Sequence, residues 1–428
     1  MSRGTELPPP LRVEQALRLL PDVDALTPLR ALLVSRSRAR PSAEPYRTVG
    51  KRFVQTTDLA ELVPQAVARV SEHLAALYQA AVEALEADQR DDLAAAVRAL
   101  LRAGALEERV GRDTQAHAWY EHALGLAEGL RDRQPEIETL RHLGHLEATR
   151  GRFEDAARRY QRSLALAEAE LDDDGTARAC LGLGGVAQAQ ARWQGAASWY
   201  ARGLRHAEAD RGLTADLLFG LGDLAREREQ FDVAEDHLGR AQAAFEDIGK
   251  VDGAARVLNA WGALEASRER RAEALRRYHE GLARLQGAGR NAQLEMAIRL
   301  NLARLYLDWQ RLPDAEDEIR VAEEIAIVYN LTRQLARLYV VLGMVRGQQR
   351  DETGFVFFEK AIELCRGDEP LPRLEAEVYV EYALFRKALG EPDEARGYLE
   401  RAREILEVVH HGALLARVDA ELAQLALP

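Results

Sequence analysis

Histidine and carboxylate side chains that could bind a metal ion occur together at one place in the sequence. Glu138, His142 and His145 share one face if residues 138–145 form a helix. Three such side chains could bind zinc and leave one coordination position open. No further carboxylate or thiolate is supplied at ligand spacing, and a polar helix face accounts for the same residues. We therefore expect no metal at this site.

Two glycine-rich stretches and one histidine–glutamate pair are the other places where the sequence suggests chemistry. Residues 182–185 (GLGG) and 220–223 (GLGD) are glycine-rich like a dinucleotide-binding loop, but no strand pattern precedes either of them. His279 and Glu280 lack the second histidine one turn later that a zinc-protease helix carries. Phosphate-binding-loop and nucleophile-elbow motifs are missing from the sequence. We therefore predict a protein that is not an enzyme and has no cofactor.

Composition indicates a helical, negatively charged protein. The 428 residues carry a formal net charge of −12, and 47% of them are hydrophobic. Alanine, leucine, glutamate and arginine dominate while β-branched residues are sparse, which favours helix over strand. A general nucleic-acid binder needs net positive charge to release counterions. Nucleic acid is therefore an unfavoured partner.

The sequence also indicates where the protein works. Its first residues contain no apolar segment of the secretory type, and nowhere do eighteen apolar residues follow one another. Cys180 and Cys365 lie far apart in apolar helical patterns, which favours buried thiols in a reducing compartment over a disulfide. Arginine far outnumbers lysine, as in GC-rich bacterial genomes. We expect a cytoplasmic, bacterial protein that does not bind a membrane.

A repeat of about 40 residues runs through most of the chain. Its clearest marker is a small residue shortly after a turn: Ala116, Ala156, Ala196, Ala234, Ala274, Ala315, Gly354 and Ala395. A large apolar residue follows each marker after four positions and another small residue after seven, so all three share one helix face. A glycine or alanine stands eleven or twelve positions before each marker, inside another helical pattern.

This repeat predicts helical hairpins. A glycine inside a helix costs about 1 kcal/mol relative to alanine, so its return indicates a packing reason, for which we predict close approach of two helix backbones. Short turns join the two helices, and breakers such as residues 172–175 (DDDG) separate the hairpins. A hairpin cannot bury its apolar face alone and must stack on its neighbours. The sequence therefore predicts an all-α fold, an α-solenoid superhelix.

The residues of the repeat resemble the tetratricopeptide repeat. Leu143-Gly144, Ala156, Tyr160 and Ser163 carry the resemblance, which covers residues 97–409 in about eight hairpins. The period is near 40 residues rather than 34, and the proline that usually ends the second helix is mostly missing. In its period the array is similar to those of kinesin light chains, LGN-type polarity adaptors and bacterial peptide-sensing regulators.

Outside the array we expect three further parts. Residues 1–57 form a partly helical N-terminal segment with a basic linker at 36–52, residues 58–96 form N-terminal capping helices, and residues 410–428 form a C-terminal capping helix. The basic composition of the linker is most simply that of a solvated segment. The alternatives are an arm that folds onto acidic parts of the array, or a contact for an acidic partner or nucleic acid. The sequence leaves the oligomeric state open.

The resemblance implies a concave groove built from the first helix of each hairpin. The residues six positions before each packing glycine, or before its alanine replacement, then face the groove: Arg98, Glu138, Arg178, Asp216, Arg256, Ala297, Arg337 and Glu377. Their charges nearly alternate, which favours a ladder of ion pairs between adjacent repeats, each exposed pair worth under about 1 kcal/mol. The alternative is a charged groove that sets the register of a bound peptide or helix.

Two places raise the expectation of binding. Asn301, with Arg304, falls where proteins of this kind use an asparagine to hold a ligand's backbone, since an amide can donate and accept at once. A locally basic region consists of Arg98, Arg102, Arg141, His142 and His145. It could receive a carboxylate, and protonation of its two histidines would tighten that binding as the pH falls toward 6.

These considerations give one predicted function and two alternatives. We expect a scaffold or adaptor that binds a peptide or helix of a partner protein in the groove. The expected binding residues are Arg98, Arg102, Arg141, His142, His145, Arg178, Asp216, Arg256, Asn301, Arg304 and Arg337. One alternative is a regulatory sensor whose groove binds a small peptide or metabolite and so changes partner engagement. The other is a structural subunit of a larger assembly, held through the convex face.

Overall fold

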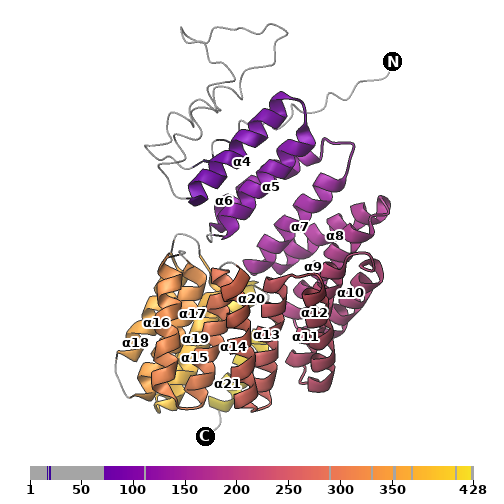
Figure 1. The fold of residues 1–428 in the computed structure, drawn as a ribbon. Helices are drawn as coiled ribbons and strands as arrows, with labels where there is room; N and C mark the ends of the chain where they lie inside the picture. The colour runs from indigo at the N-terminus through magenta and orange to yellow at the C-terminus, as the bar shows by residue number, and fades with distance from the viewer. Residues whose placement is uncertain are drawn as a thin grey trace, which may run out of the picture. The chain divides into compact units, whose positions relative to one another are not determined.

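A computed structural model describes most of the chain. The described residues are Leu17, Leu19, Leu20, 72–109, 112–288, 291–328, 331–349, 353–367, 370–409 and 412–425. They form helices and turns and contain no strand (Figure 1). The predicted basic linker at 36–52 lies outside them, as do most of residues 1–57. The chain divides into two compact units, residues 1–146 and 147–428.

Antiparallel helices build the first unit. It contains α4 (Glu72–Gln89), α5 (Leu93–Arg109), α6 (Asp113–Ala127) and most of α7 (Gln134–Thr149). Helix α4 packs on α5, and α5 packs on α6. Trp119 and Tyr120 of α6 are fully buried because the small residues Ala96, Ala99 and Ala103 of α5 also lie in the core and leave room for large neighbours.

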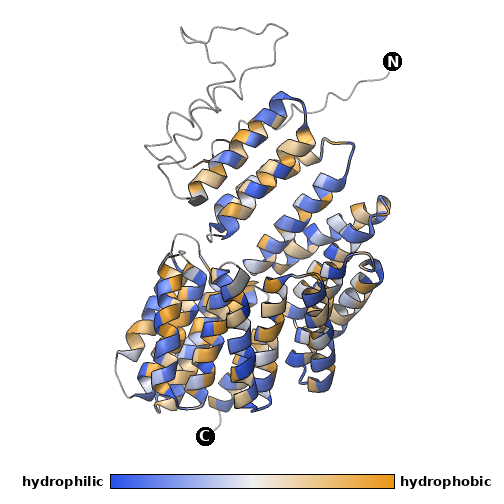
Figure 2. Cartoon of the chain, viewed as in Figure 1, coloured by the Kyte–Doolittle hydropathy of each residue, from blue (hydrophilic) through white to orange (hydrophobic). Residues whose placement is uncertain are grey.

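The second unit is a row of hairpins with one further helix at its end. Its helices are α8 (Phe153–Ala169), α9 (Asp173–Ala189), α10 (Trp193–His206), α11 (Arg211–Glu227), α12 (Phe231–Asp247), α13 (Val251–Ser267), α14 (Arg271–Ala288), α15 (Ala292–Asp308), α16 (Leu312–Val328), α17 (Thr332–Gln348), α18 (Gly354–Cys365), α19 (Pro372–Ala388), α20 (Pro392–Val409) and α21 (Gly412–Leu425). Along the helices that can be seen in Figure 2, apolar (orange) and polar (blue) residues recur, as hairpins that bury one face require.

The first helices of successive hairpins form an inner layer. Helix α9 contacts α11, α11 contacts α13, and the same contact recurs through α15, α17 and α19. Each of these helices also pairs with the second helix of its own hairpin, from α10 to α20. This two-layer stacking is an α-solenoid, so the predicted all-α fold class is confirmed.

An aromatic ring explains most of the recurring glycines. A Cβ on Gly184 would overlap the ring of Tyr200, and a Cβ on Gly262 would overlap the ring of Tyr278. The predicted packing reason therefore exists, but its main partner is the large residue of the second helix and not another helix backbone. The reason is geometric: the aromatic ring of the second helix lies directly on the backbone at the glycine and fills the space that a side chain at that position would occupy.

A left-handed residue ends the first helix of most hairpins. Positive φ recurs five positions before the marker residue at Gly151, Ala191, Glu229, Glu269, Gln310 and Gly390. At Ala191, for example, the backbone N–H donates to the carbonyl of Gln188 at 2.9 Å, and the next N–H, of Arg192, donates to that of Ala187 at 2.8 Å. These two bonds satisfy carbonyls that a helix end leaves without partners.

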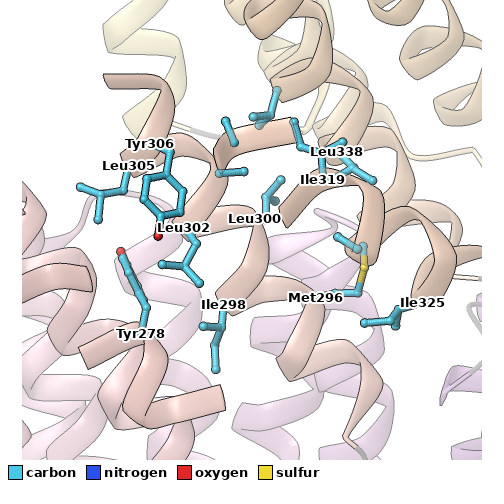
Figure 3. Packing of buried hydrophobic residues seen from close by; sticks show 14 of the residues in the cluster. Tyr278, Met296, Ile298, Leu300, Leu302, Leu305, Tyr306, Ile319, Ile325 and Leu338 are labelled. Atoms are coloured by element: carbon cyan, nitrogen blue, oxygen red, sulfur yellow. The ribbon is translucent and has the colours of Figure 1, made fainter. Parts of the chain in front are cut away.

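Clusters of buried residues bridge successive hairpins of the second unit. The cluster in the middle of the unit includes Tyr278 of α14, Met296 and Leu302 of α15, and Ile319 of α16 (Figure 3). Cys180 and Cys365 are buried free thiols, as predicted, and burial raises their pKa values to about 11 and about 12. In the part of the chain that the structure describes, no helix is both long and apolar enough to span a membrane.

The end of the second unit returns to its beginning. Gly412, at the start of α21, lies against the backbone carbonyl of Gln190, which follows α9. Gly151, just before α8, lies against Arg373 of α19 and Val409 of α20. These contacts bring the first and last helices of the row together, and they create the pocket described next.

Candidate functional site

A pocket of about 610 Å³ lies between the two ends of the second unit. Gln188, Trp193 and Glu227 line one wall and come from α9, α10 and α11. Helices α15, α17, α19 and α21 provide the other wall, which includes Arg304 and Arg337. Buried apolar side chains such as Val340 and Val378 form part of its lining. A site with a few convergent polar groups over an apolar floor is typical of ligand binding.

Hydrogen bonds fix the side chains of the first wall. Gln188 stands one turn after Gly184, so the hydroxyl of the tyrosine ring packed there, Tyr200, donates to Gln188 Oε1 at 2.9 Å. Gln188 Nε2 in turn donates to Asp223 Oδ2 at 2.9 Å. Burial and the nearby Asp223 carboxylate raise the pKa of Glu227. This wall therefore presents oriented acceptors and favours a ligand that donates hydrogen bonds.

Arginine and glutamate alternate along the second wall. Glu377 forms ion pairs of 3.1 Å with both Arg337 and Arg373, and Glu381 forms one of 3.2 Å with Arg417. Arg304 is exposed at the pocket and makes no ion pair or hydrogen bond within the described residues. A ligand carboxylate could therefore pair with Arg304 without breaking an existing bond.

Several predicted groove residues instead bind their neighbours. Arg256 pairs with Asp216 and Arg337 with Glu377, each across adjacent repeats. Arg178 bonds to Asp174 at 2.7 Å and to Asp210, in the next repeat, at 2.8 Å. The ladder interpretation of the alternating charges therefore describes these positions. Each of these arginines must therefore lose an existing bond before it can bind a ligand.

An amide pair connects two central hairpins. Asn301 Nδ2 of α15 donates to Asn259 Oδ1 of α13 at 2.8 Å, and both side chains are half-buried. Each amide has four hydrogen-bonding positions, so this one bond leaves both donors and acceptors on the pair. The sequence analysis missed Asn259, although its separation of 42 residues from Asn301 is close to the repeat period.

The predicted basic region belongs to the first unit. Arg98, Arg102 and His142 line a second pocket, of about 600 Å³, between α4, α5 and α7. Arg102 is paired with Glu83, and His145 lies 3.5 Å from Glu108. Arg98 is exposed and makes no ion pair within the described part of the chain. Arg141, on α7, acts on its neighbour His142 through its charge.

The expectation that protonation near pH 6 tightens binding is wrong for His142. Burial, with the positive charge of Arg141 and the neighbouring His145, lowers the pKa of His142 to about 3. Its ring stacks on Tyr120 with the centroids 5.3 Å apart, which explains the burial. His142 therefore stays neutral at pH 6 and cannot tighten binding there. Among the residues that the structure describes, no three histidine, cysteine or acidic side chains are placed to hold a metal ion.

All of the predicted site residues except Arg141 and His145 fall into three groups. Arg304 and Arg337 meet in the first pocket, and Arg98, Arg102 and His142 meet in the second. Arg178, Asp216, Arg256 and Asn301 are engaged with other side chains of the array. Sequence reasoning missed the residues that α19 and α21 bring to the first pocket, Arg373, Glu381 and Arg417. No sequence signal identifies them, because they reach the pocket only where the row of helices closes.

Comparison with known proteins identifies the repeat. The tetratricopeptide repeat model matches residues 135–209, so the resemblance seen in the sequence is confirmed there. No curated protein matches the chain.

Several solved structures have a similar course of helices. One is NprR in complex with its cognate peptide NprX, at 13% identity, with 77% of this chain and 98% of that chain covered and a TM-score of 0.49. A second is the Rap conjugation gene regulator of the plasmid pLS20 in complex with the Phr* peptide, at 13% identity, 84% and 96% coverage and a TM-score of 0.48. A third is a signal transduction ATPase with a tetratricopeptide repeat sensor from Pyrococcus horikoshii, at 15% identity, 96% and 72% coverage and a TM-score of 0.49.

Proposed function

We propose that the chain is a non-catalytic adaptor whose second unit binds an extended peptide segment of a partner protein. The observation that carries the proposal is Arg304, which lines the pocket, makes no ion pair or hydrogen bond within the described residues and lies three residues after Asn301 on the same helix. One helical turn separates them, so they face the same side of α15. A peptide's backbone could bond to the amide pair while a carboxylate, from a side chain or a terminus, pairs with Arg304.

The other polar groups define the class of peptide. Gln188 and Glu227 offer acceptors on the first wall, whereas Arg304 offers donors opposite them. A peptide that carries both an acidic and a basic or amide group would satisfy both walls. The apolar lining adds room for at least one apolar side chain. The repeats over 135–209 support a function in binding, because such arrays present extended concave surfaces.

The regulatory sensor remains the second candidate because of where the pocket lies. One wall comes from α9 to α11, near the start of the second unit, and the other includes α19 and α21, near its end. A ligand that bridges them would stabilise the closed arrangement by its preference for that state. A partner protein whose binding depends on the spacing of these helices would then bind differently when the ligand is present.

The test compares binding by a groove variant and a surface variant. We expect Asn301→Ala combined with Arg304→Glu to reduce capture of the wild-type partner from a native lysate by at least roughly tenfold, because a central charge is reversed. The control is Arg320→Glu, an exposed arginine of α16 that the pocket does not use.

The two outcomes are distinct. Loss of the partner in the groove variant alone would support the proposal, provided that circular dichroism shows the same helix content in all three proteins. Equal capture by the groove variant and the wild type would contradict it and would direct attention to the outer face.

A further inference from the structure

A strained and exposed leucine ends α8. Leu171 has φ 55°, in the left-handed region, and its side chain is 89% exposed. Both features are unfavourable, because left-handed backbone costs an ordinary L-residue about 1–2 kcal/mol and exposed leucine loses the gain from burial. Its side chain has the highest exposure of the large hydrophobic residues in the described part of the chain.

The same turn elsewhere in the array uses glycine. Two repeats later, 78 residues along the chain, Gly249 occupies the equivalent position with φ 68°. Both turns have the same hydrogen bonds: Asp172 N–H donates to the Ala167 carbonyl at 2.8 Å, as Lys250 N–H does to that of Phe245 at 2.9 Å. The turn therefore does not require a leucine. Leu171 lowers the stability of the folded chain, which suggests that it has a role other than stabilising the fold.

Acidic residues surround this leucine. Residues 170–174 (ELDDD), here called the acidic knuckle, contain four carboxylates besides Leu171. Asp173 remains 76% exposed although it bonds to His206, and Asp174 remains 53% exposed although it bonds to Arg178. The knuckle is thus one protruding apolar side chain within a patch of negative charge.

A complementary pocket lies at the opposite end of the same helix. It has a volume of about 500 Å³ and an apolar side made by Pro370, Pro372, Val408 and Val409. Val408 is 77% exposed, so it is a second large apolar side chain that the chain itself does not cover. Arg150, Arg152 and Arg158 line the pocket beside the acidic Glu154 and Asp155, and Arg159 and Arg162 continue the surface along α8, so arginines outnumber carboxylates there. Two of these arginines already have partners within the chain, since Arg152 pairs with Glu147 and Arg158 with Asp155. This region is here called the basic pocket.

The knuckle cannot enter the basic pocket of its own chain. Helix α8 (Phe153–Ala169) separates the two and, with 17 residues at 1.5 Å each, holds them about 25 Å apart. The fit can therefore be made only between two copies. Because the two surfaces differ, one copy could bind a second through its knuckle and a third through its pocket.

We propose that the chain associates head to tail, with Leu171 of one copy in the basic pocket of the next. The leucine contacts the proline and valine side chains, and the carboxylates of the knuckle face the arginines. Burial of Leu171 and Val408 supplies affinity, while the opposite charges orient the contact. Such a heterologous contact yields open chains, or a ring where the rotation between copies closes.

The test measures the mass of the full-length protein by sedimentation velocity over a wide range of concentrations. We expect the wild type to grow beyond a dimer as concentration rises, and added salt to weaken the association. Leu171→Gly and Val408→Asp should each weaken it by at least roughly tenfold. Leu171→Gly should do so without lowering the unfolding temperature, because glycine suits the left-handed turn. Val356→Ser, which removes a 51% exposed apolar residue of α18, is the matched control and should leave association unchanged.

A mixture of the two variants gives the sharper result. Leu171→Gly keeps an intact basic pocket, and Val408→Asp keeps an intact knuckle, so an equal mixture should form a dimer and nothing larger. A wild type that stays monomeric throughout, or a mixture with no dimer, would overturn the proposal. Association that both variants leave unchanged would overturn it as well and would indicate a different interface.

Discussion

At the scale of single residues, the tyrosines do more than fill space. Tyr120 and Tyr200 each cover a glycine of the preceding helix and donate a hydrogen bond four residues beyond it, to Glu108 at 2.8 Å and to Gln188 at 2.9 Å. Gln188 then reaches Asp223 of the next hairpin. A buried packing residue, Tyr200, thus orients a side chain that lines the candidate pocket.

His142 allows a direct test of burial at this scale. Its folded-state pKa is lowered to about 3 from the usual 6.5, so between these values the unfolded chain binds the proton more readily. The stability of the first unit therefore falls as the pH drops below 6.5. We expect the His142 Cε1 proton, followed by NMR, to keep the shift of a neutral ring down to pH 5. The signal is assigned by its loss in His142→Gln, and a titration midpoint near 6.5 would contradict the burial described here.

At the scale of the helical hairpin, the turns carry local strain where glycine is absent. Glu229 has φ 57° and lies exposed at the end of α11, in the position that Gly151 and Gly390 occupy in other hairpins. Its side chain makes no hydrogen bond or ion pair within the described residues. The backbone bonds of the turn, and not the glutamate side chain, hold the conformation.

Replacement of this residue should therefore stabilise the protein. We expect Glu229→Gly to raise the free energy of unfolding by about 0.5–1 kcal/mol, because relief of the left-handed strain exceeds the added freedom of the unfolded chain. Urea denaturation followed by circular dichroism measures the change. The matched control is Arg228→Gly, at the adjacent position with negative φ, which should be neutral or destabilising. A loss of stability in Glu229→Gly would show that the strain is smaller than the entropy cost.

At the scale of the whole molecule, stability depends on how the ends of the array are covered. In the second unit we propose that α21 is the C-terminal cap. Val418 is fully buried against the last hairpin, and Arg417, Lys387 and Glu421 form ion pairs around it. Helix α21 also supplies Arg417 to the candidate pocket, so the cap and the binding site share one element.

A charge placed beneath this helix tests its capping role. We expect Val418→Asp to lower the free energy of unfolding by about 2–4 kcal/mol, since an unpaired carboxylate would be buried. Ala420→Asp, two residues away and exposed, should change it little and serves as the control. Thermal unfolding of both variants gives the comparison, and equal unfolding temperatures would show that α21 does not cap the array.

The sequence by itself determined the class of fold and much of its local structure. In each repeat the small marker residue, the large residue four positions after it and the small residue seven positions after it predicted a helical hairpin, because a helix places all three on one face. The alternating charges predicted ion pairs between neighbouring repeats, and Asp216 with Arg256 forms one. These features depend on contacts between residues no more than about one repeat apart in the sequence. Such contacts can be predicted directly from the periodic pattern of the sequence.

Only the tertiary structure decided where the ends of the array meet. Gln188 and Arg417 line one pocket although more than 200 residues separate them, because small rotations between successive hairpins add up along the row. The total rotation cannot be read from the residues of any single repeat. The partial burial of His142 against Tyr120 depended likewise on the packing of one hairpin on the next. The residue pattern within a repeat specifies each hairpin, whereas the rotations added over many hairpins determine which residues meet at the candidate pocket.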